Sequence, residues 1–551
     1  MRVSKKKTVK LEAAVHSSAL AAIIGTLLLT TVASVGGQLP PLLPLSPRDS
    51  SNSDSVKAQL HMQKETGPEA MEIIKKRGFI GELYTISSRD NAPLSLYHVI
   101  NPLADPNTLN RFPVLIYHGV FGDAAQMLGH SDLARPRRPV LNEVTFDETD
   151  TNLAFMLANN NFDVYLADGR GTNLNNHLVA VDFNPLMGNK FWNFSLDEQA
   201  LMDLPSCLDF VLDQTGETKL HYVGFSESTL FMFALLSTYP QYQDKLASYV
   251  ALAPVAYISY ISGTTLAAMA PAAMIPDTIN FNYVPQMLTD TVASVFRKMC
   301  QLEAVARTAC AFFTDSFAGL GSTEVSHGFY GTSFKSTSLK AVKHFMQLYA
   351  QKRFGMYDHG PDGNMRAYGS LEPPRYDLSR IHLPRLILFR GAKDLLSDQQ
   401  DNARLLKELG TKPYLDFNYP DYNHMDFLLG TDVIERVNVP AARVMLAILN
   451  QLTTALGQPR TRDPAKLQLL QASRQKPLEV ARPDGTRNIE IKSNLVNHVI
   501  EGAVESLGAK PIDGTKELDI AAPLTTTLFE QPLKLVKDMV GGGVVANKLL
   551  G

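Results

Sequence analysis

Short β-strand-like runs alternate with helical stretches along most of this chain. From residue 71 onward there are seven runs rich in valine, isoleucine, leucine and tyrosine: GELYTIS, PLSLYHVI, PVLIYHG, FDVYLAD, KLHYVGF, ASYVALAP and RLILFRG. Strands that alternate with helices predict a mostly parallel sheet covered by helices on both faces. In such sheets the functional residues lie at the carboxyl ends of the strands. The residues that directly follow these runs are therefore the first candidates for a site.

The alternation stops in the middle of the chain and then returns. Between residues 256 and 374 helical patterns replace the β-like runs, as in Thr289 to Phe313 and Ser338 to Arg353. This arrangement predicts a core in two parts, residues 67–255 and 375–457, separated by an inserted helical cap domain at 256–374.

Both ends of the chain differ from this core. Basic residues precede an apolar stretch from Ala19 to Val35, an order that predicts a signal peptide at residues 1–37, with an uncleaved signal anchor as the alternative. Residues 38–66 are rich in proline and serine and are expected to form a linker or propeptide. Residues 458–551 form a C-terminal extension to which no chemistry can be assigned.

Composition excludes several classes of function. The chain has 52 lysines and arginines against 55 aspartates and glutamates, a net charge of −3, so no nucleic-acid partner is expected. The uncharged run from Val250 to Pro276 is interrupted by Pro254, Gly263 and Pro271, so no integral membrane span is expected after signal removal. Neither a metal-binding motif nor a phosphate-binding loop followed by lysine occurs, so neither a metal nor a cofactor is implied.

Ser226 lies where a β-like run passes directly into a helical pattern. The sequence there is KLHYVG-FSES-TLFMFALLS. A strand-to-helix turn of this kind exposes a serine hydroxyl above the sheet edge, and the helix N-terminus offers backbone N–H groups to a developing oxyanion. The motif G-x-S-x-G requires small residues two positions before and after the serine; Gly224 fits, and Ser228 replaces the second glycine. Ser226 is therefore the candidate nucleophile.

A nucleophilic serine needs a histidine base and an acid that orients it. His424 follows the β-like run YLDFNY, and Asp394 follows RLILFRG. Both residues stand at predicted strand ends and complete the chain order Ser, Asp, His. Asp398 and Asp401 are the rival acids, but they fall in the next helical stretch.

The turn after PVLIY is the candidate for an oxyanion-binding loop. It contains His118-Gly119-Val120, placed so that a backbone N–H can point back at the serine. We expect the Val120 N–H to act there, and the His118 side chain to be structural.

With these motifs in place, the chain resembles the acid lipase family that includes gastric lipase and lysosomal acid lipase. The resemblance extends from about residue 68 to 449. The matching segments are EIIKKRGFIGELYTISSRDNAPLSLYHV, the His-Gly turn, LADGRGTNLNNH, FWNFSLDEQALMDLPSCLDFVL, LHYVGFSES, the proline pair at 373–374, GAKDLLSDQQD and YNHMDFLLGTD.

The resemblance implies an α/β-hydrolase fold, a mostly parallel central sheet flanked by helices, with an inserted helical cap. It implies that Ser226 is the nucleophile, Asp394 the triad acid and His424 the base. Val120 and Glu227 then correspond to the oxyanion-hole N–H donors. The expected activity is hydrolysis of triacylglycerol or sterol esters at a lipid–water interface, by a secreted or lysosomal enzyme.

Cysteine and asparagine residues add two expectations for an exported protein. The three cysteines allow one disulfide and one free thiol, and Cys300 and Cys310 are similar in placement to the cap disulfide of the family. Asn193-Phe194-Ser195 is the single glycosylation sequon, and the adjacent Phe191 and Trp192 leave a buried, unmodified site as the alternative.

The elbow departs from the family pattern in two positions. The family has G-H-S-Q-G, whereas this chain has GFSES. Ser228 is expected to crowd the approach of strand and helix, at a cost of about 1–3 kcal/mol. A charged Glu227 would oppose the oxyanion. A catalytically weakened or inactive lipid-binding carrier is therefore the alternative function.

Overall fold

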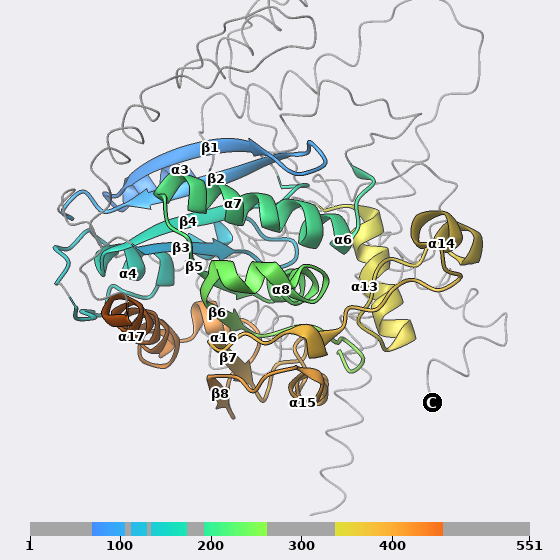
Figure 1. Cartoon of the computed structure of the whole chain (residues 1–551). Coiled ribbons are helices and arrows are strands. Elements are labelled where there is room, and N and C mark those ends of the chain that lie inside the picture. Colours follow the sequence, from blue (N-terminus) through green and yellow to red (C-terminus); the bar gives the residue numbers. More distant parts are fainter. Residues whose placement is uncertain are drawn as a thin grey trace, which may run out of the picture. The chain divides into compact units, whose positions relative to one another are not determined.

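A twisted sheet with helices on both faces forms the core of the part of the chain that the structure describes (Figure 1). The computed structural model describes residues 69–104, 112–128, 134–140, 142–172, 192–261, 335 and 337–455. These residues belong to one unit, Thr66–Arg462. The predicted signal peptide, linker and C-terminal extension, and much of the predicted cap, lie outside the described residues, so the domain boundaries stay predictions.

Within the described residues, eight strands form a single sheet in the order β1-β2-β4-β3-β5-β6-β7-β8. The strands are β1 (Ile80–Ser87), β2 (Pro93–Ile100), β3 (Phe112–Tyr117), β4 (Phe162–Asp168), β5 (Leu220–Phe225), β6 (Leu246–Leu252), β7 (Leu386–Gly391) and β8 (Leu415–Tyr419). Strands β3 to β8 pair in parallel, which confirms the predicted mostly parallel sheet. The pairs β1·β2 and β2·β4 are antiparallel, a detail that the β-like runs alone did not predict.

The seven β-like runs coincide with β1 to β7, and YLDFNY contains β8. Helices and helical turns connect the strands. They are α3 (Glu69–Lys76), η1 (Gln126–Leu128), α4 (Leu153–Asn159), α6 (Leu196–Glu198), η4 (Gln199–Asp203), α7 (Leu204–Thr215), α8 (Glu227–Thr238), η5 (Pro240–Lys245), α13 (Leu339–Gln351), α14 (Pro361–Tyr368), η6 (Leu378–Arg380), α15 (Gln399–Glu408), α16 (Asp426–Leu429), η7 (Ile434–Asn438) and α17 (Val439–Ala455).

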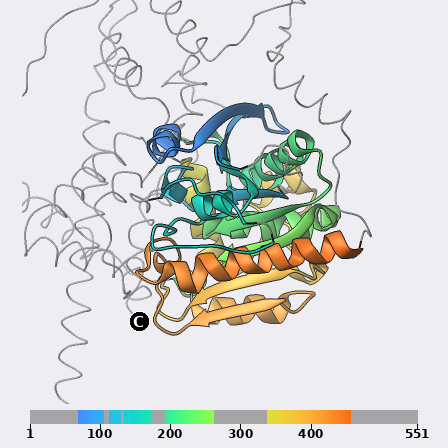
Figure 2. The same ribbon diagram turned by 90° about the vertical axis from the view of Figure 1, so that its left-hand side faces the viewer.

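The two faces of the sheet bury separate hydrophobic clusters. Because side chains alternate along a strand, Leu115 packs with α7 and α8, whereas its neighbours Val114 and Ile116 pack with α4 and α17. Figures 1 and 2 show these helix pairs on opposite faces. Burial on both faces explains why central strands such as β3 and β6 are almost continuously apolar, whereas β1 and β8, at the two ends of the sheet, alternate between more and less exposed residues.

The second half of the predicted insertion is helical where it is described. Helix α13 lies within the stretch from Ser338 to Arg353 that was predicted to be helical. The Ser338 side chain caps the helix by accepting from the Ala341 N–H. No helix in the described part of the chain is both long and apolar enough to cross a bilayer. The uncharged run that starts at Val250 begins inside β6.

Candidate active site

Ser226 occupies a strained turn between β5 and α8. Its backbone has φ 56° and ψ −118°, a conformation that non-glycine residues rarely adopt. The Ser226 N–H donates to Leu252 O at the end of β6 (2.9 Å), and the Ser226 carbonyl accepts from the Thr229 N–H (2.9 Å). This is the geometry of a nucleophile elbow, which directs the side chain away from the sheet.

The two small residues around Ser226 allow strand and helix to meet. A Cβ on Gly224 would lie 3.2 Å from the backbone carbon of Ser228, a tight contact that glycine avoids. Ser228 is fully buried, yet its hydroxyl accepts from the Phe225 N–H (2.9 Å) and donates to Tyr117 O (2.8 Å). The crowding expected from Ser228 is therefore offset by two bonds, one within the elbow to Phe225 and one that ties the elbow to β3 at Tyr117. Sequence reasoning missed this function of Ser228.

The structure brings Ser226, His424 and Asp394 into one hydrogen-bonded row. His424 Nε2 lies 2.8 Å from Ser226 Oγ, and His424 Nδ1 lies 2.9 and 3.0 Å from the two carboxylate oxygens of Asp394. All three residues are at most 5% exposed. In this arrangement the imidazole can accept the serine proton at Nε2 while the carboxylate holds Nδ1–H.

Asp394 is held in place by the turn that follows β7. Its Oδ1 accepts from the backbone N–H groups of Leu396 and Ser397, both at 2.8 Å. The rival acids have other partners: Asp398 caps α15, and Asp401 accepts from the Tyr260 N–H at 2.9 Å.

The loop after β3 passes directly against the elbow. A Cβ on Gly119 would lie 3.1 Å from Ser226 Cβ, a tight contact that glycine avoids at this close approach. Val120 is the residue directly after Gly119 in this loop. Glu227 is the first residue of α8, where a backbone N–H has no acceptor within the helix. The two expected N–H donors thus flank Ser226 from the loop and from the helix.

His118 is structural, as its position in the turn suggested. Its Nδ1 lies 2.8 Å from Gly119 O, and its Nε2 accepts from the Gly169 N–H at 3.3 Å. Burial lowers the pKa of His118 to about 4, so the ring is neutral at physiological pH and joins the loop to the residue after β4.

Glu227 has a buried side chain. The residue is 4% exposed, and no described residue lies within hydrogen-bonding distance of its Oε1. Burial raises the pKa of Glu227 to about 8, because nothing offsets the cost of a desolvated charge. The carboxyl group is therefore neutral at pH 7, which removes the negative charge that the sequence led us to expect.

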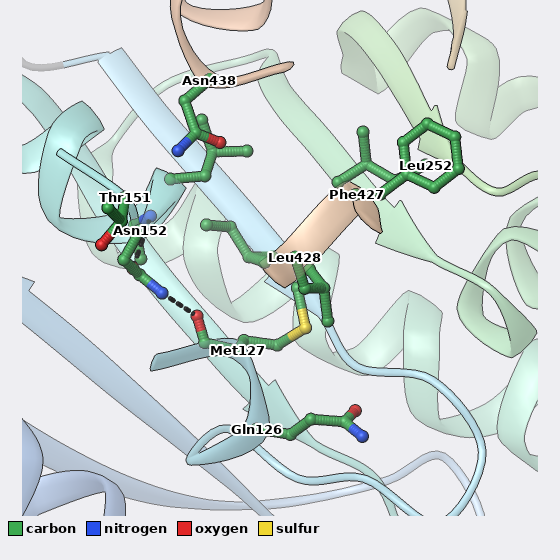
Figure 3. A pocket seen from close by; sticks show the side chains of 11 residues that line it. Gln126, Met127, Thr151, Asn152, Leu252, Phe427, Leu428 and Asn438 are labelled. Carbon is green, nitrogen blue, oxygen red and sulfur yellow. Dashed lines mark hydrogen bonds between the residues drawn. The ribbon is translucent and has the colours of Figure 1, made fainter. Parts of the chain in front are cut away.

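A narrow pocket lies behind the site (Figure 3). Its lining residues come from the loop after β3, helix α4, the end of β6 and the segment after His424: Ile116, Gln126, Met127, Thr151, Asn152, Leu153, Ala154, Leu252, Phe427, Leu428 and Asn438. The Asn152 side chain donates to Met127 O (2.6 Å) at its edge. Neither Ser226 nor His424 lines this pocket, so it is not where a ligand would meet the serine hydroxyl.

The remaining site predictions fall outside this centre. Cys207 is a buried free thiol, whereas Cys300 and Cys310 lie outside the described residues, so their pairing stays a prediction. Asn193 is exposed, although its neighbours Trp192 and Phe194 are buried. Within the described residues no group of histidine, cysteine and acidic side chains is arranged to hold a metal ion.

Comparison with known proteins gives a consistent result. Residues 113–431, more than half of the chain, match the family described as alpha/beta hydrolase fold. The chain is 27% identical to lipase member K of Homo sapiens over 378 residues, 66% of this chain and 88% of the relative. It is 28% identical to gastric triacylglycerol lipase of Bos taurus over 406 residues, 70% of this chain and 94% of the relative. The resemblance to the gastric type of lipase is thereby confirmed.

Two further relatives were found. Lipase 1 of Drosophila melanogaster is 28% identical over 375 residues, 66% of this chain and 76% of the relative. A solved structure of a soluble variant of monoglyceride lipase from Saccharomyces cerevisiae is 12% identical, with a TM-score of 0.39, and the match covers 68% of this chain and 96% of that structure.

Replacement of Ser228 tests the bonds that anchor the elbow. Ser228→Ala leaves the buried Phe225 N–H without its acceptor, so we expect the free energy of unfolding to fall by about 1–3 kcal/mol. Urea unfolding followed by circular dichroism measures this. Ser237→Ala is the matched control, because that buried hydroxyl bonds only within its own helix, to Ala234 O. Equal stability of Ser228→Ala and wild type would contradict the anchoring role.

The buried carboxyl of Glu227 makes stability depend on pH. The ordinary pKa of this group is 4.5, and burial raises it to about 8, so between these values the folded protein binds more protons than the unfolded chain. The free energy of unfolding should therefore fall as the pH rises from about 4.5 to about 8, by at most about 1.4 kcal/mol per pH unit from this group.

Glu227→Gln should remove that contribution, which urea unfolding between pH 5 and 9 would measure. Glu143→Gln, at an exposed carboxyl, is the control and should follow the wild-type curve. Parallel curves for wild type and Glu227→Gln would show that Glu227 ionises normally.

Proposed function

Because this chain belongs to the α/β-hydrolase family, we propose that it is a lipase that hydrolyses the carboxylic ester bonds of neutral lipids, triacylglycerols or sterol esters, through an acyl-enzyme. The observation that carries the proposal is the buried row from Ser226 Oγ through His424 to Asp394, with contacts of 2.8 to 3.0 Å. The names of the lipase relatives support the substrate class.

The reaction begins with attack on the ester carbonyl. The Ser226 oxygen bonds to the carbonyl carbon as His424 Nε2 takes its proton, and Asp394 stabilises the resulting imidazolium. The N–H groups of Val120 and Glu227 hold the oxyanion. His424 then gives the proton to the departing alcohol, and a water molecule activated by the same histidine releases the fatty acid from Ser226.

The second candidate function is a lipid carrier with weak or no turnover, because the elbow departs from the family pattern. Two observations weigh against it. The Ser228 hydroxyl is satisfied within the fold, and burial holds the Glu227 carboxyl neutral at pH 7 by raising its pKa to about 8. An uncharged Glu227 side chain places no negative charge beside the oxyanion that the Glu227 N–H would bind.

We also propose that the protein is exported, to the extracellular space or the lysosome, with residues 1–37 as the signal peptide and Cys300 bonded to Cys310. The lipase relatives and the basic, then apolar, start of the chain support this. A cap formed by residues 256–374 would cover the serine in water and admit substrate at a lipid surface.

The decisive test is hydrolysis of a panel of short-chain, triacylglycerol and sterol esters between pH 4 and 8. Ser226→Ala should lower kcat by up to about 10⁶-fold while export and folding are retained, and His424→Ala should be nearly as severe. The double variant should be no worse than Ser226→Ala, because the residues act as a unit. Comparable turnover by Ser226→Ala would overturn the assignment. Lipid binding without hydrolysis at any pH would favour the carrier.

Export predicts a glycan on Asn193, whose side chain is exposed. Glycosidase treatment of the secreted protein should increase its gel mobility, and Asn193→Gln should have the same mobility with and without treatment. Asn91→Gln, which alters no sequon, is the control. Unchanged mobility of the wild-type protein would show that the sequon is unused.

A further inference from the structure

The loop that presents Val120 contains a strained residue. Phe121, the next residue, has φ 54°, a region disfavoured for a bulky side chain. We name residues 119–126 the oxyanion loop. Within it the Gly122 N–H donates to Gly119 O and the Gln126 N–H donates to Asp123 O, both at 3.1 Å, but neither bond involves the backbone of Phe121. Contacts from other parts of the chain therefore help to hold the strained residue.

Lys335, more than 200 positions later in the sequence, contacts this loop twice. Its backbone N–H donates to Phe121 O at 2.7 Å, directly at the strained residue. Its side-chain Nζ lies 3.4 Å from Asp123 and 2.8 Å from Glu69 on α3. One residue thus fixes both the backbone and a side chain of the oxyanion loop.

Asp123 is the residue of the oxyanion loop that contacts the Lys335 side chain. The residue is 7% exposed, and its Oδ1 accepts from the Gln126 N–H at 3.0 Å. Burial raises the pKa of Asp123, and the ammonium of Lys335 opposes that effect. Without the lysine this carboxylate would be buried with no cation beside it, a state that is strongly unfavourable.

Asp168 fixes the other side of the loop from the end of β4. Its Oδ1 accepts from the Ala124 N–H at 2.6 Å, and its Oδ2 accepts from the Tyr97 hydroxyl at 3.1 Å. The loop is therefore attached to a rigid strand at Ala124 and to Lys335 at Phe121 and Asp123. The attachment at Phe121 is a backbone bond, whereas the attachment at Asp123 depends on the charged side chain of Lys335.

On the basis of the proposed function, we propose that Lys335 is a positioning residue that acts through Asp123 and Phe121 to place the Val120 N–H for oxyanion binding. Lys335 lies in the sequence between β6 and β7, so this segment contributes a residue that contacts the oxyanion loop. It completes the geometry of the oxyanion loop.

The test compares full-length Lys335→Met with wild type on a water-soluble short-chain ester. A misplaced oxyanion donor weakens only the transition state, so kcat should fall about 10- to 100-fold, somewhat less than the roughly 100- to 1000-fold loss of a whole donor. KM should stay within about twofold, and Lys335→Arg should recover most of the activity because it keeps the charge. Lys340→Met is the matched control: this half-buried lysine of the same segment contacts Glu198 instead, at 3.6 Å.

A second readout separates positioning from general loosening of the fold. A trifluoromethyl ketone adds to Ser226 as a tetrahedral adduct with an oxyanion, so its inhibition constant should rise in Lys335→Met by the factor by which kcat/KM falls. Asp123→Asn should have the same effect and serves as the second variant if Lys335→Met does not fold. The double variant should be no worse than the worse single variant.

The outcomes are distinct. Unchanged kcat and ketone affinity in a folded Lys335→Met, with active wild type and inactive Ser226→Ala, would overturn the positioning proposal alone. A fall equal to that of Lys340→Met would do the same. Absence of ester hydrolysis by the wild-type protein would overturn the proposed function, and the role of Lys335 with it.

Discussion

The candidate site depends on one strained backbone conformation, the positive φ of Ser226 between β5 and α8. Such a conformation costs about 1–3 kcal/mol and persists only where surrounding structure determines it. Here the Ser226 N–H is held by Leu252 O of the next strand, and the Ser228 hydroxyl joins the elbow to the end of β3. The strain directs the serine hydroxyl out of the sheet, toward His424.

The parallel sheet explains how residues distant in sequence meet at this turn. Ser226, Asp394 and His424 follow β5, β7 and β8, and the oxyanion loop follows β3, so all of them emerge at the same edge. The strands bury both faces, which leaves this edge as the place where polar side chains can gather. The 198 positions between Ser226 and His424 are bridged by a contact of 2.8 Å.

Much of this arrangement could be predicted because the relevant signals are local. A β-like run followed by a small residue pattern indicated the elbow at Ser226, and strand ends indicated Asp394 and His424. The antiparallel start of the sheet was not predicted, because strand direction depends on how β1, β2 and β4 pair and not on the β-like runs themselves. Nor could the partners of Ser228 and Lys335, because each contact joins segments whose proximity depends on the completed fold.

Two buried carboxyl groups close to the candidate site, those of Glu227 and Asp123, have different surroundings. Glu227 has no cation beside it among the described residues, and burial raises its pKa to about 8, so it is kept neutral by protonation. Asp123 has the Lys335 ammonium at 3.4 Å, which favours its charged form and opposes the rise in pKa that burial causes. The difference follows from position: a charge beside the helix N-terminus would oppose the oxyanion, whereas a charge behind the loop can bind a cation without facing the reaction. Glu227 is therefore an uncharged neighbour of the oxyanion, whereas Asp123 is one half of an ion pair with Lys335.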